Sequence, residues 1–347
     1  MARTRIVLNA LSLRRDGSGV QTYVRELLGA LPGAWPDANF AARVAQSAAA
    51  LVPAGVVPVP VRLGADHGLA RRVRSLVPAH DADLVHALDT DATIAGAPSV
   101  VTVHDLALFD VPDAFDARRG RAKRVLVAGA IRRADAIVSV SAFTAERVRE
   151  RFGRDSTVVL EAPGRNFAPA GAAAIADVRE RYALPECFVL HLGNLEPRKD
   201  LGTLAAACGD VGVPLVLAGG AINTAGPPPN VHALGYVPTA DLPALYGAAR
   251  VVAYVSRYEG FALPPVEAMA CGAVVMATPV GALPDVAGEG VEVVTVGDVD
   301  AQAGALRELL HDDDRRNERR AAAVRAVGEL SWERAARDTV AVYQRLL

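Results

Sequence analysis

The sequence predicts two α/β domains, each a Rossmann-like, doubly wound parallel sheet, and three observations support this fold class. Short β-branched apolar runs alternate along the chain with longer helical stretches. The apolar runs are continuous rather than alternating, which indicates strands covered on both faces, as in a parallel sheet. A loose segment rich in Pro, Gly and Ala, Ala162–Ala174, interrupts the pattern near the middle of the 347 residues.

The first half of the chain, 1–165, is expected to form the N-terminal domain. Its strands are predicted at Ile6–Leu8, Ala42–Ala45, Val56–Val61, Leu84–Ala87, Ser99–Val103, Ala136–Val140 and Thr157–Leu160. Its helices are predicted at Val20–Leu31, His67–Leu76, Asp116–Arg133 and Ala142–Phe152. Each is an apolar run or a helical stretch bounded by turn residues.

The pattern resumes after the loose segment, so 170–330 is expected to form a second domain of the same architecture. Its strands are predicted at Cys187–Leu192, Pro214–Ala218, Val231–Leu234, Val251–Val255, Val274–Ala277 and Val291–Val296. A charged helix, Arg315–Glu329, and a terminal helix, Trp332–Leu347, follow the last strand. We find no sequence repeat between the halves.

Composition excludes several classes of protein. A formal net charge of -2 gives no general attraction to nucleic acid. Cys187, Cys208 and Cys271 lack metal-ligand spacing and are expected to be small core residues in a reducing compartment, with no disulfide and no metal. No window approaches the ~18 apolar residues of a membrane span, so we expect a cytoplasmic protein.

The run Glu259–Glu267 carries the strongest chemical signal. An apolar strand delivers Glu259 at its carboxyl end, Gly260 turns the chain, and Pro264 and Pro265 can open a helix that carries Glu267. Free N–H groups at a helix N-terminus suit a phosphate, and carboxylates accept hydrogen bonds from sugar hydroxyls. The pattern predicts a site for a sugar attached to phosphate, although a strand–helix junction with two solvated acids is the alternative.

Other unusual residues follow predicted strands, where ligands of open parallel sheets bind. Two such domains facing each other would line a central cleft with these loops. The adjacent cations Arg198-Lys199 can neutralise a diphosphate, or they can be a solvated charge cluster. The pair His104-Asp105 can likewise have only a structural role. The loops are Gly17-Ser18-Gly19, His104-Asp105, Gly193–Asp200 and Gly235-Tyr236-Val237-Pro238, the last of which can present its backbone to a nucleobase.

The order of these motifs resembles the retaining glycosyltransferases of family 4, which have the GT-B fold and a Glu-x7-Glu motif. The resemblance covers nearly the whole chain and is strongest over Glu259–Gly272 and Gly193–Asp200. The form Gly-Asn-Leu-Glu-Pro-Arg-Lys looks most like the mannosyltransferase branch. It implies that the terminal helix 332–347 packs back onto the first domain.

The resemblance also implies residue roles for a nucleotide diphosphate sugar donor. Arg198 and Lys199 would hold the diphosphate and Glu267 the ribose hydroxyls, while Glu259 would hold the transferred sugar. Tyr236 and Val237 would lie at the nucleobase. The remaining contacts would be backbone groups of Gly260, Phe261, Ala262 and Leu263, Gly19 over the diphosphate, and His104 near the reacting centre.

Two residues depart from the pattern of the family. Many members have Arg where this chain has Asn194, which puts one phosphate contact in doubt, and others have Gly where it has Ala262. The implied reaction retains configuration, with attack on the face that the phosphate leaves, and needs no metal or resident cofactor. Cations and N–H dipoles stabilise the leaving group. A glycosyl-enzyme on Glu259 is the less favoured version.

Further features have alternative interpretations. Asp89-Thr90-Asp91 looks like a metal-binding Asp-x-Asp but is expected to be a solvated loop, and Asp312-Asp313-Asp314 a charged helix junction. The basic helix over 118–133 is by default a solvated face, yet such a helix can also meet an anionic lipid surface or a phosphorylated acceptor. A nucleotide-sugar epimerase or hydrolase of the same fold, or a binding module without catalysis, are the alternative functions. The sequence does not identify the donor, the acceptor or the oligomeric state.

Overall fold

The computed structural model describes residues 3–15, 19–61, 81–90, 96–115, 117–193, 196–220 and 230–347, with the side chains of 117–119 left aside. The chain divides into two compact units. Unit 1 comprises Met1–Ala162 and Leu330–Leu347, and unit 2 comprises Pro163–Glu329. The chain therefore enters unit 2 at Pro163 and returns to unit 1 at Leu330.

Unit 1 is built on a parallel sheet of seven strands in the order β3-β2-β1-β4-β5-β6-β7. The strands are β1 Arg5–Asn9, β2 Asn39–Ala45, β3 Val56–Val61, β4 Leu84–Ala87, β5 Ser99–Val103, β6 Ala136–Ser139 and β7 Thr157–Val158. Its helices are α1 Gly19–Ala34, α3 Ala107–Asp110, α4 Ala117–Arg133, α5 Ala142–Phe152 and α13 Trp332–Gln344, with 3-10 turns at Gln46–Leu51 and Pro112–Ala114. The strand order reverses between β1 and β4, the kind of switch point at which doubly wound sheets bind ligands.

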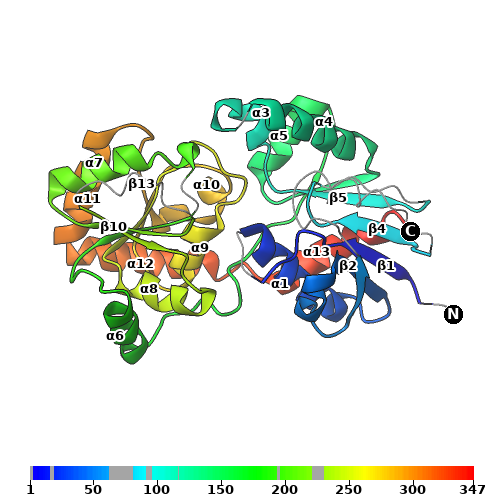
Figure 1. Ribbon diagram of the computed structural model, residues 1–347, viewed down its shortest axis with the longest axis horizontal. Helices are drawn as coiled ribbons and strands as arrows, with labels where there is room; N and C mark the ends of the chain where they lie inside the picture. Colours follow the sequence, from blue (N-terminus) through cyan, green and yellow to red (C-terminus); the bar gives the residue numbers. More distant parts are fainter. Residues whose placement is uncertain are drawn as a thin grey trace. The chain divides into compact units, whose positions relative to one another are not determined.

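A buried chain of hydrogen bonds ties α1 and α13 to the sheet of unit 1. The Tyr23 hydroxyl on α1 lies 2.9 Å from Thr102 Oγ1 on β5, and Thr102 Oγ1 lies 2.8 Å from His86 Nε2 on β4. His86 Nδ1 lies 2.6 Å from the Tyr343 hydroxyl on α13. The last helix of the chain thus packs beside α1 within unit 1 (Figure 1).

Unit 2 is built on a parallel sheet of six strands in the order β10-β9-β8-β11-β12-β13. The strands are β8 Val189–Leu192, β9 Leu215–Ala218, β10 Val231–Gly235, β11 Val251–Tyr254, β12 Val275–Ala277 and β13 Val291–Val293. Its helices are α6 Ala172–Arg181, α7 Leu201–Val211, α8 Leu242–Ala248, α9 Leu263–Ala270, α10 Leu283–Val286, α11 Val299–His311 and α12 Asp313–Val327, with 3-10 turns at Pro197–Lys199, Thr239–Asp241 and Gly288–Gly290. Here the order reverses between β8 and β11, which makes these two strands neighbours.

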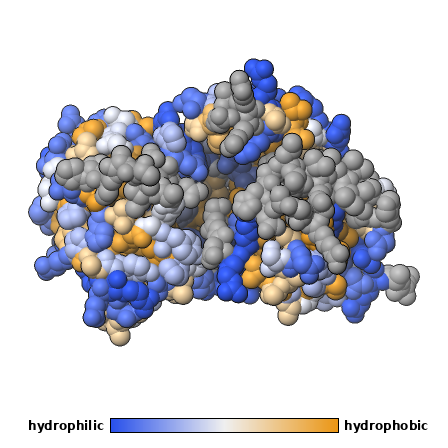
Figure 2. Space-filling model, in the orientation of Figure 1, coloured by the Kyte–Doolittle hydropathy of each residue, from blue (hydrophilic) through white to orange (hydrophobic). Residues whose placement is uncertain are grey.

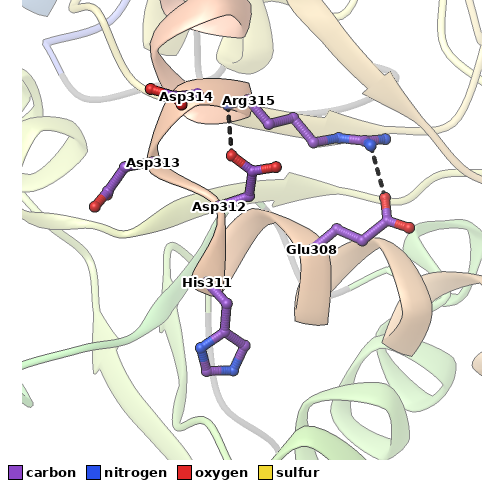
Figure 3. Close-up of a pocket in the computed structure, with 6 residues that line it drawn as sticks. All are labelled: Glu308, His311, Asp312, Asp313, Asp314 and Arg315. Atoms are coloured by element: carbon purple, nitrogen blue, oxygen red, sulfur yellow. Dashed lines mark hydrogen bonds and ion pairs between the residues drawn. The ribbon is translucent and has the colours of Figure 1, made fainter.

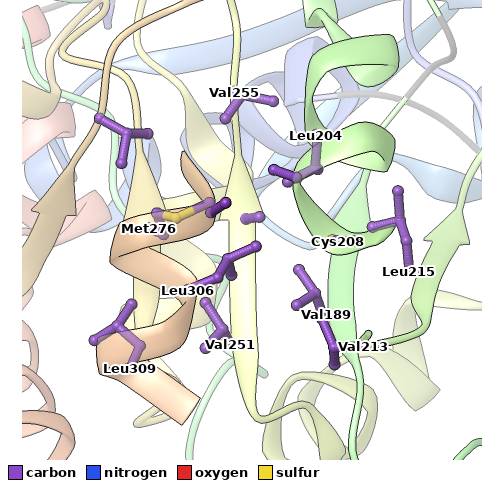
Figure 4. Packing of buried hydrophobic residues seen from close by; sticks show 14 of the residues in the cluster. Val189, Leu204, Cys208, Val213, Leu215, Val251, Val255, Met276, Leu306 and Leu309 are labelled. Carbon is purple, nitrogen blue, oxygen red and sulfur yellow. The ribbon is translucent and has the colours of Figure 1, made fainter. Parts of the chain in front are cut away.

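The core on one face of the unit 2 sheet is purely apolar. Val251 and Val255 of the β11 segment point to this face together with Val189 of β8, because alternate residues of a strand share a side. Leu204 of α7 and Leu306 of α11 cover them (Figure 4). This packing holds the carboxyl ends of β8 and β11 side by side.

The predicted fold class, two doubly wound parallel-sheet units, is confirmed. Some details differ. Cys187 is exposed, not a core residue, because β8 begins only at Val189 and Cys187 lies in the preceding turn. The expected strands Thr157–Leu160 and Val291–Val296 are shorter, because the one partner strand of each ends there, β6 at Ser139 and β12 at Ala277. The segment Ala162–Ala174 is not loose throughout, because α6 begins at Ala172; the predicted helix His67–Leu76 lies outside the described residues.

The surface is mixed in character. On the face drawn in Figure 2, hydrophilic residues and scattered patches of hydrophobic residues alternate across the coloured parts of the surface. Within the described ranges, every helix is too short or too polar to cross a bilayer.

Candidate active site

The turn between β11 and α9 places Glu259 at the carboxyl edge of the unit 2 sheet. Helix α9 starts at Leu263, and two prolines occupy its first turn, where no intrahelical N–H donor is needed. Ala262 caps it with φ 75 and ψ 63, a left-handed conformation that a residue other than Gly seldom adopts. Gly281 packs against the turn so closely that a Cβ there would lie 2.9 Å from the Gly260 carbonyl oxygen. The turn is therefore held by its neighbours.

One oxygen of Glu259 accepts three hydrogen bonds. Its Oε1 accepts from Lys199 Nζ at 2.6 Å, from Ser256 Oγ at 2.8 Å and from Arg198 Nη1. Glu259 is only 7% exposed and Lys199 only 4%. The carboxylate, the ammonium and the guanidinium thus form a buried ionic cluster at the end of β8 and β11.

The two cations come from the 3-10 turn that follows β8. Lys199 Nζ also lies 2.5 Å from the Tyr254 hydroxyl and 4.3 Å from the centre of that ring. Arg198 also donates to the Tyr258 carbonyl at 2.7 Å and, through Nε, to Glu196 Oε2 at 2.6 Å. With Glu196 and Glu259 ionised, the formal charges of this group cancel.

The charges within the cluster favour the ionised forms of Glu259 and Arg198. Burial opposes ionisation of Glu259, but the charges of Lys199 and Arg198 outweigh it, so the pKa of the carboxyl group is lowered. Burial also disfavours the Arg198 cation, yet Glu259 raises its pKa above the ordinary value. For Lys199 burial is the larger effect, and the pKa of its ammonium is lowered. The ammonium group of a lysine has three N–H donors, which suit an anionic ligand.

The loops beside this cluster approach one another through glycine. A Cβ on Gly219, after β9, would lie only 2.4 Å from the carbonyl oxygen of Gly193, after β8. Gly219 also has φ 121, a backbone conformation that favours glycine, so both the close contact and the backbone exclude a larger residue. Asn194, which departs from the family pattern, lies outside the described residues.

The other predicted donor-binding residues of unit 2 are placed as follows. Glu267 is buried in the last turn of α9. Burial raises the pKa of Tyr246 and of Cys271, and the negative charge of Glu267 raises both further. Tyr236 is 55% exposed and Val237 is buried, both just after β10. Phe261 and Leu263 are buried beside the turn, and Gly260 lies within it. The proposed roles of these residues stay predictions.

In unit 1, His104 follows β5 and has both ring nitrogens engaged. Nδ1 lies 3.2 Å from Glu161 Oε1, and Nε2 lies 2.9 Å from the Leu88 carbonyl oxygen. A carbonyl can only accept, so Nε2 carries a hydrogen, and an ionised Glu161 requires one on Nδ1 as well. Burial alone would lower the pKa of His104, but Glu161 raises it to about 9. The ring is therefore an imidazolium whose edge meets Tyr23, with centroids 4.7 Å apart.

The remaining predicted residues are described only in part. Asp89 Oδ1 accepts from the Thr90 backbone at 2.7 Å, and Asp105 Oδ1 accepts from Ala107 N at the start of α3. Asp91, Gly17 and Ser18 lie outside the described residues, whereas Gly19 begins α1. Among the described side chains we find no group of three or more His, Cys, Asp or Glu residues that could hold a metal ion.

The acidic run at the junction of α11 and α12 has a structural role. Asp312 Oδ1 accepts from Arg315 N at 2.9 Å and so caps α12, while Arg315 pairs with Glu308 at 2.9 Å (Figure 3). His311 and Asp313 also line this open depression, which lies at the far end of α11 from Val299. These contacts agree with the expectation of a charged helix junction.

The sequence analysis missed four residues of these clusters. Ser256 and Tyr254 support Glu259 and Lys199, His191 stacks on Tyr254 at 5.8 Å between ring centres, and Glu161 fixes His104. Ser256 and Tyr254 lie within seven residues of Glu259 at the end of the same predicted strand, and this position could have indicated that they belong to the site. Nothing local indicated Glu161.

Comparison with known proteins follows the division into units. Residues 17–161 match the family described as Glycosyltransferase Family 4, and residues 177–326 match Glycosyl transferases group 1. The O-antigen chain mannosyltransferase B of Escherichia coli is 30% identical over 268 residues, which cover 72% of this chain and 70% of that protein. The serotype-specific mannosyltransferase WbdA of E. coli is 30% identical over 242 residues, but these span only 29% of its length.

A solved structure extends the likeness to the whole fold. HepE of Anabaena, in complex with UDP-glucose, has a TM-score of 0.76 at 18% identity, with 100% of both chains covered. The two parallel-sheet units have the GT-B fold, and the family models together with the mannosyltransferase relatives make the chain a glycosyltransferase. The chain belongs to glycosyltransferase family 4, in the branch that resembles mannosyltransferases.

Proposed function

We propose that the enzyme transfers a hexose from a nucleotide diphosphate sugar to a hydroxyl group of a glycan, a lipid-linked sugar or a small natural product, with retention of configuration. The donor is GDP-mannose or a similar UDP or dTDP sugar. No metal and no resident cofactor takes part; the nucleotide sugar is a co-substrate.

One observation supports this proposal above the others: Arg198 and Lys199 converge with Glu259 at the carboxyl edge of the unit 2 sheet. Two cations beside a helix N-terminus are suited to a diphosphate, since charge-assisted hydrogen bonds to phosphate are among the strongest in proteins. The second oxygen of Glu259 makes no hydrogen bond to any other described residue, and it is suited to a sugar hydroxyl.

The class of donor is supported by the relatives. Mannosyltransferase B transfers mannose by its name, and HepE was solved with UDP-glucose. The order of β8 and β11 brings the proposed phosphate residues and the proposed sugar residue together in unit 2, so this unit carries the donor site in our proposal. Glu267 and the loop at Tyr236 and Val237 would take the ribose and the base.

In the proposed reaction the phosphate leaves from the sugar as the acceptor hydroxyl attacks on the same face. Cations held in place before the reaction stabilise the negative charge of the leaving diphosphate without reorganisation. The departing phosphate takes the proton of the acceptor, and Glu259 orients the sugar. Gly19 and His104 of unit 1 are assigned to the diphosphate and to the reacting sugar only by the resemblance.

The test is a two-stage assay of the purified chain. GDP, UDP and dTDP are first ranked by calorimetry, and the intact sugar donor of the preferred nucleotide is then incubated with and without monosaccharide, glycan and lipid-linked acceptors. Transfer that requires an acceptor, with the anomeric configuration retained by NMR, is the expected result. A changed sugar in the absence of acceptor would instead indicate the epimerase or hydrolase alternative, and binding without turnover a binding module.

We also propose a peripheral contact of α4 with anionic lipid at the cytoplasmic membrane face. Along this helix Arg121, Lys123, Arg132 and Arg133 are exposed, and Val125 among them is 69% exposed. Cations around an exposed apolar side chain suit an anionic headgroup layer. Sedimentation with vesicles of phosphatidylglycerol, against neutral phosphatidylcholine vesicles, tests this; equal binding to both, or to neither, contradicts it.

A further inference from the structure

The cations assigned to the diphosphate are paired with a carboxylate. Lys199 Nζ lies 2.6 Å from Glu259 Oε1, and Arg198 Nη1 donates to the same oxygen. Arg198 Nε lies 2.6 Å from Glu196 as well. An arriving diphosphate therefore meets a group whose formal charge is balanced and whose strongest donors are occupied.

The repulsion between Glu259 and a diphosphate is strong because the carboxylate is buried. Glu259 is 7% exposed, so water and salt screen its charge poorly, and a second anion on Lys199 or Arg198 would lie within a few ångströms of it. Glu196, with its side chain 37% exposed, is better screened. Of the two carboxylates, Glu259 should weaken phosphate binding most.

A sugar can remove this obstacle where a bare nucleotide cannot. Hydroxyl groups are donors, so a sugar seated at Glu259 can replace the hydrogen bonds that the carboxylate receives from Arg198 and Lys199. Those cations are then free to turn to the phosphates. A nucleoside diphosphate without sugar offers the carboxylate no such replacement.

We propose that Glu259 is an internal counter-anion of the phosphate-binding cations, displaced by the hydroxyls of the transferred sugar, so that the site retains the loaded donor and expels the nucleotide product. This inference rests on the proposed function. It gives Glu259 a second role besides orienting the sugar: after transfer the carboxylate takes back Arg198 and Lys199 and weakens the hold on the diphosphate. Selectivity for donor over product then comes from one residue.

The decisive variant is Glu259→Gln, which keeps the shape and an acceptor oxygen but removes the charge. Calorimetry should show GDP, or whichever of UDP and dTDP the wild type prefers, binding about tenfold more tightly to the variant. The affinity for the intact sugar donor should rise less, so that the ratio of the two dissociation constants moves toward one. Product inhibition by the nucleotide should increase in parallel.

Glu196→Gln is the matched control, because it removes a carboxylate from the same Arg198 at a more exposed position. Its effect on nucleotide affinity should stay below about threefold, as for screened surface pairs. Equal gains in the two variants would mean that net charge alone matters and would overturn the assignment to Glu259. Unchanged or weaker nucleotide binding by Glu259→Gln would overturn it as well.

A second measurement uses the wild type and so does not depend on the folding of a variant. Free mannose, or the sugar of the preferred donor, should tighten nucleotide binding about fivefold or more, a typical coupling between two ligands. Absence of coupling, or competition, would overturn the inference while nucleotide binding and sugar transfer uphold the proposed function. A wild type that binds neither nucleotide nor sugar donor would overturn both.

Discussion

His104 and Glu161 form an ion pair within unit 1, with Nδ1 of the imidazole 3.2 Å from Oε1 of the carboxylate. The second ring nitrogen donates to the Leu88 carbonyl, 2.9 Å away. Both N–H groups are thus held by the protein, and the ring can act on a substrate only as a cation or by leaving one of these partners. Glu161 is a positioning residue for His104.

Loss of His104 should affect turnover more than donor binding. His104→Ala is expected to lower kcat by about a hundredfold, as for a preorganised charge that acts in the transition state, with nucleotide affinity near the wild-type value. Glu161→Gln should lower the pKa of His104 from about 9, which NMR of labelled histidine would follow. The loss of activity at alkaline pH should then move to lower pH. A variant without His104 that keeps full turnover would leave the ring a structural role.

Stability should fall in mild acid because two histidines are buried as neutral rings. Burial lowers the pKa of His191 to about 4 and that of His86 to about 3, from 6.5. Their folded pKa lies below the unfolded one, so the stability they contribute is present above pH 6.5 and is lost as the pH falls. For His191 the loss is about 2 kcal/mol at pH 5.

Denaturant unfolding of the wild type and of His191→Phe at pH 7 and at pH 5 measures this effect. The variant should lose less stability between the two pH values, by about 2 kcal/mol. His104 has the opposite sign, since its raised pKa gives stability below pH 6.5 that disappears as the pH rises toward 9. Identical pH dependence in wild type and variant would mean that His191 titrates normally in the folded state.

Replacement of Ala262 by Gly should stabilise the protein. The left-handed conformation at φ 75 costs a residue with a Cβ about 1 kcal/mol, which Gly avoids, although Gly also gains entropy when unfolded. We expect a net gain of about 0.5 kcal/mol in the free energy of unfolding. Ala176→Gly, at an exposed interior position of α6, is the control and should cost about 1 kcal/mol. Donor preference measured on the same variant tests whether this position affects the sugar.

Removal of the charge of Lys199 should weaken donor binding. Lys199→Met keeps the apolar stem in place and should reduce nucleotide diphosphate affinity about tenfold or more, since a charge-assisted hydrogen bond to phosphate is lost. Arg181→Ala, at an exposed surface pair with Asp241, serves as the control and should leave the affinity unchanged. Calorimetry that finds the two variants alike would remove Lys199 from the diphosphate site.

Transfer should proceed in the presence of a chelator. In our proposal Arg198, Lys199 and the start of α9 supply the positive potential that a metal supplies in other transferases. Activity lost with EDTA and restored by Mg²⁺ or Mn²⁺ would contradict this and direct attention to Asp89 and its neighbour Asp91. The variant Asp89→Asn would then show whether Asp89 is needed for the metal-dependent activity.

Much of the fold was predictable from the sequence, because strands buried on both faces and glycine or proline turns have local signatures. The same holds for the placement of Glu259 and of Arg198-Lys199 after strands. The errors lie at strand ends: β7 and β13 are short and Cys187 precedes its strand, because an apolar run does not show where pairing with the neighbouring strand begins or stops.

Only the tertiary structure decided which of these residues meet. Lys199 and Glu259 are 60 residues apart in sequence and contact because the strand order reverses and makes β8 and β11 neighbours. His104 and Glu161, 57 residues apart, follow β5 and β7, which have β6 between them, and they meet beyond the ends of these strands in unit 1. A local pattern specifies what a segment forms, whereas strand order is set by the packing of the whole unit, and it is strand order that turned separate charged residues into paired ones.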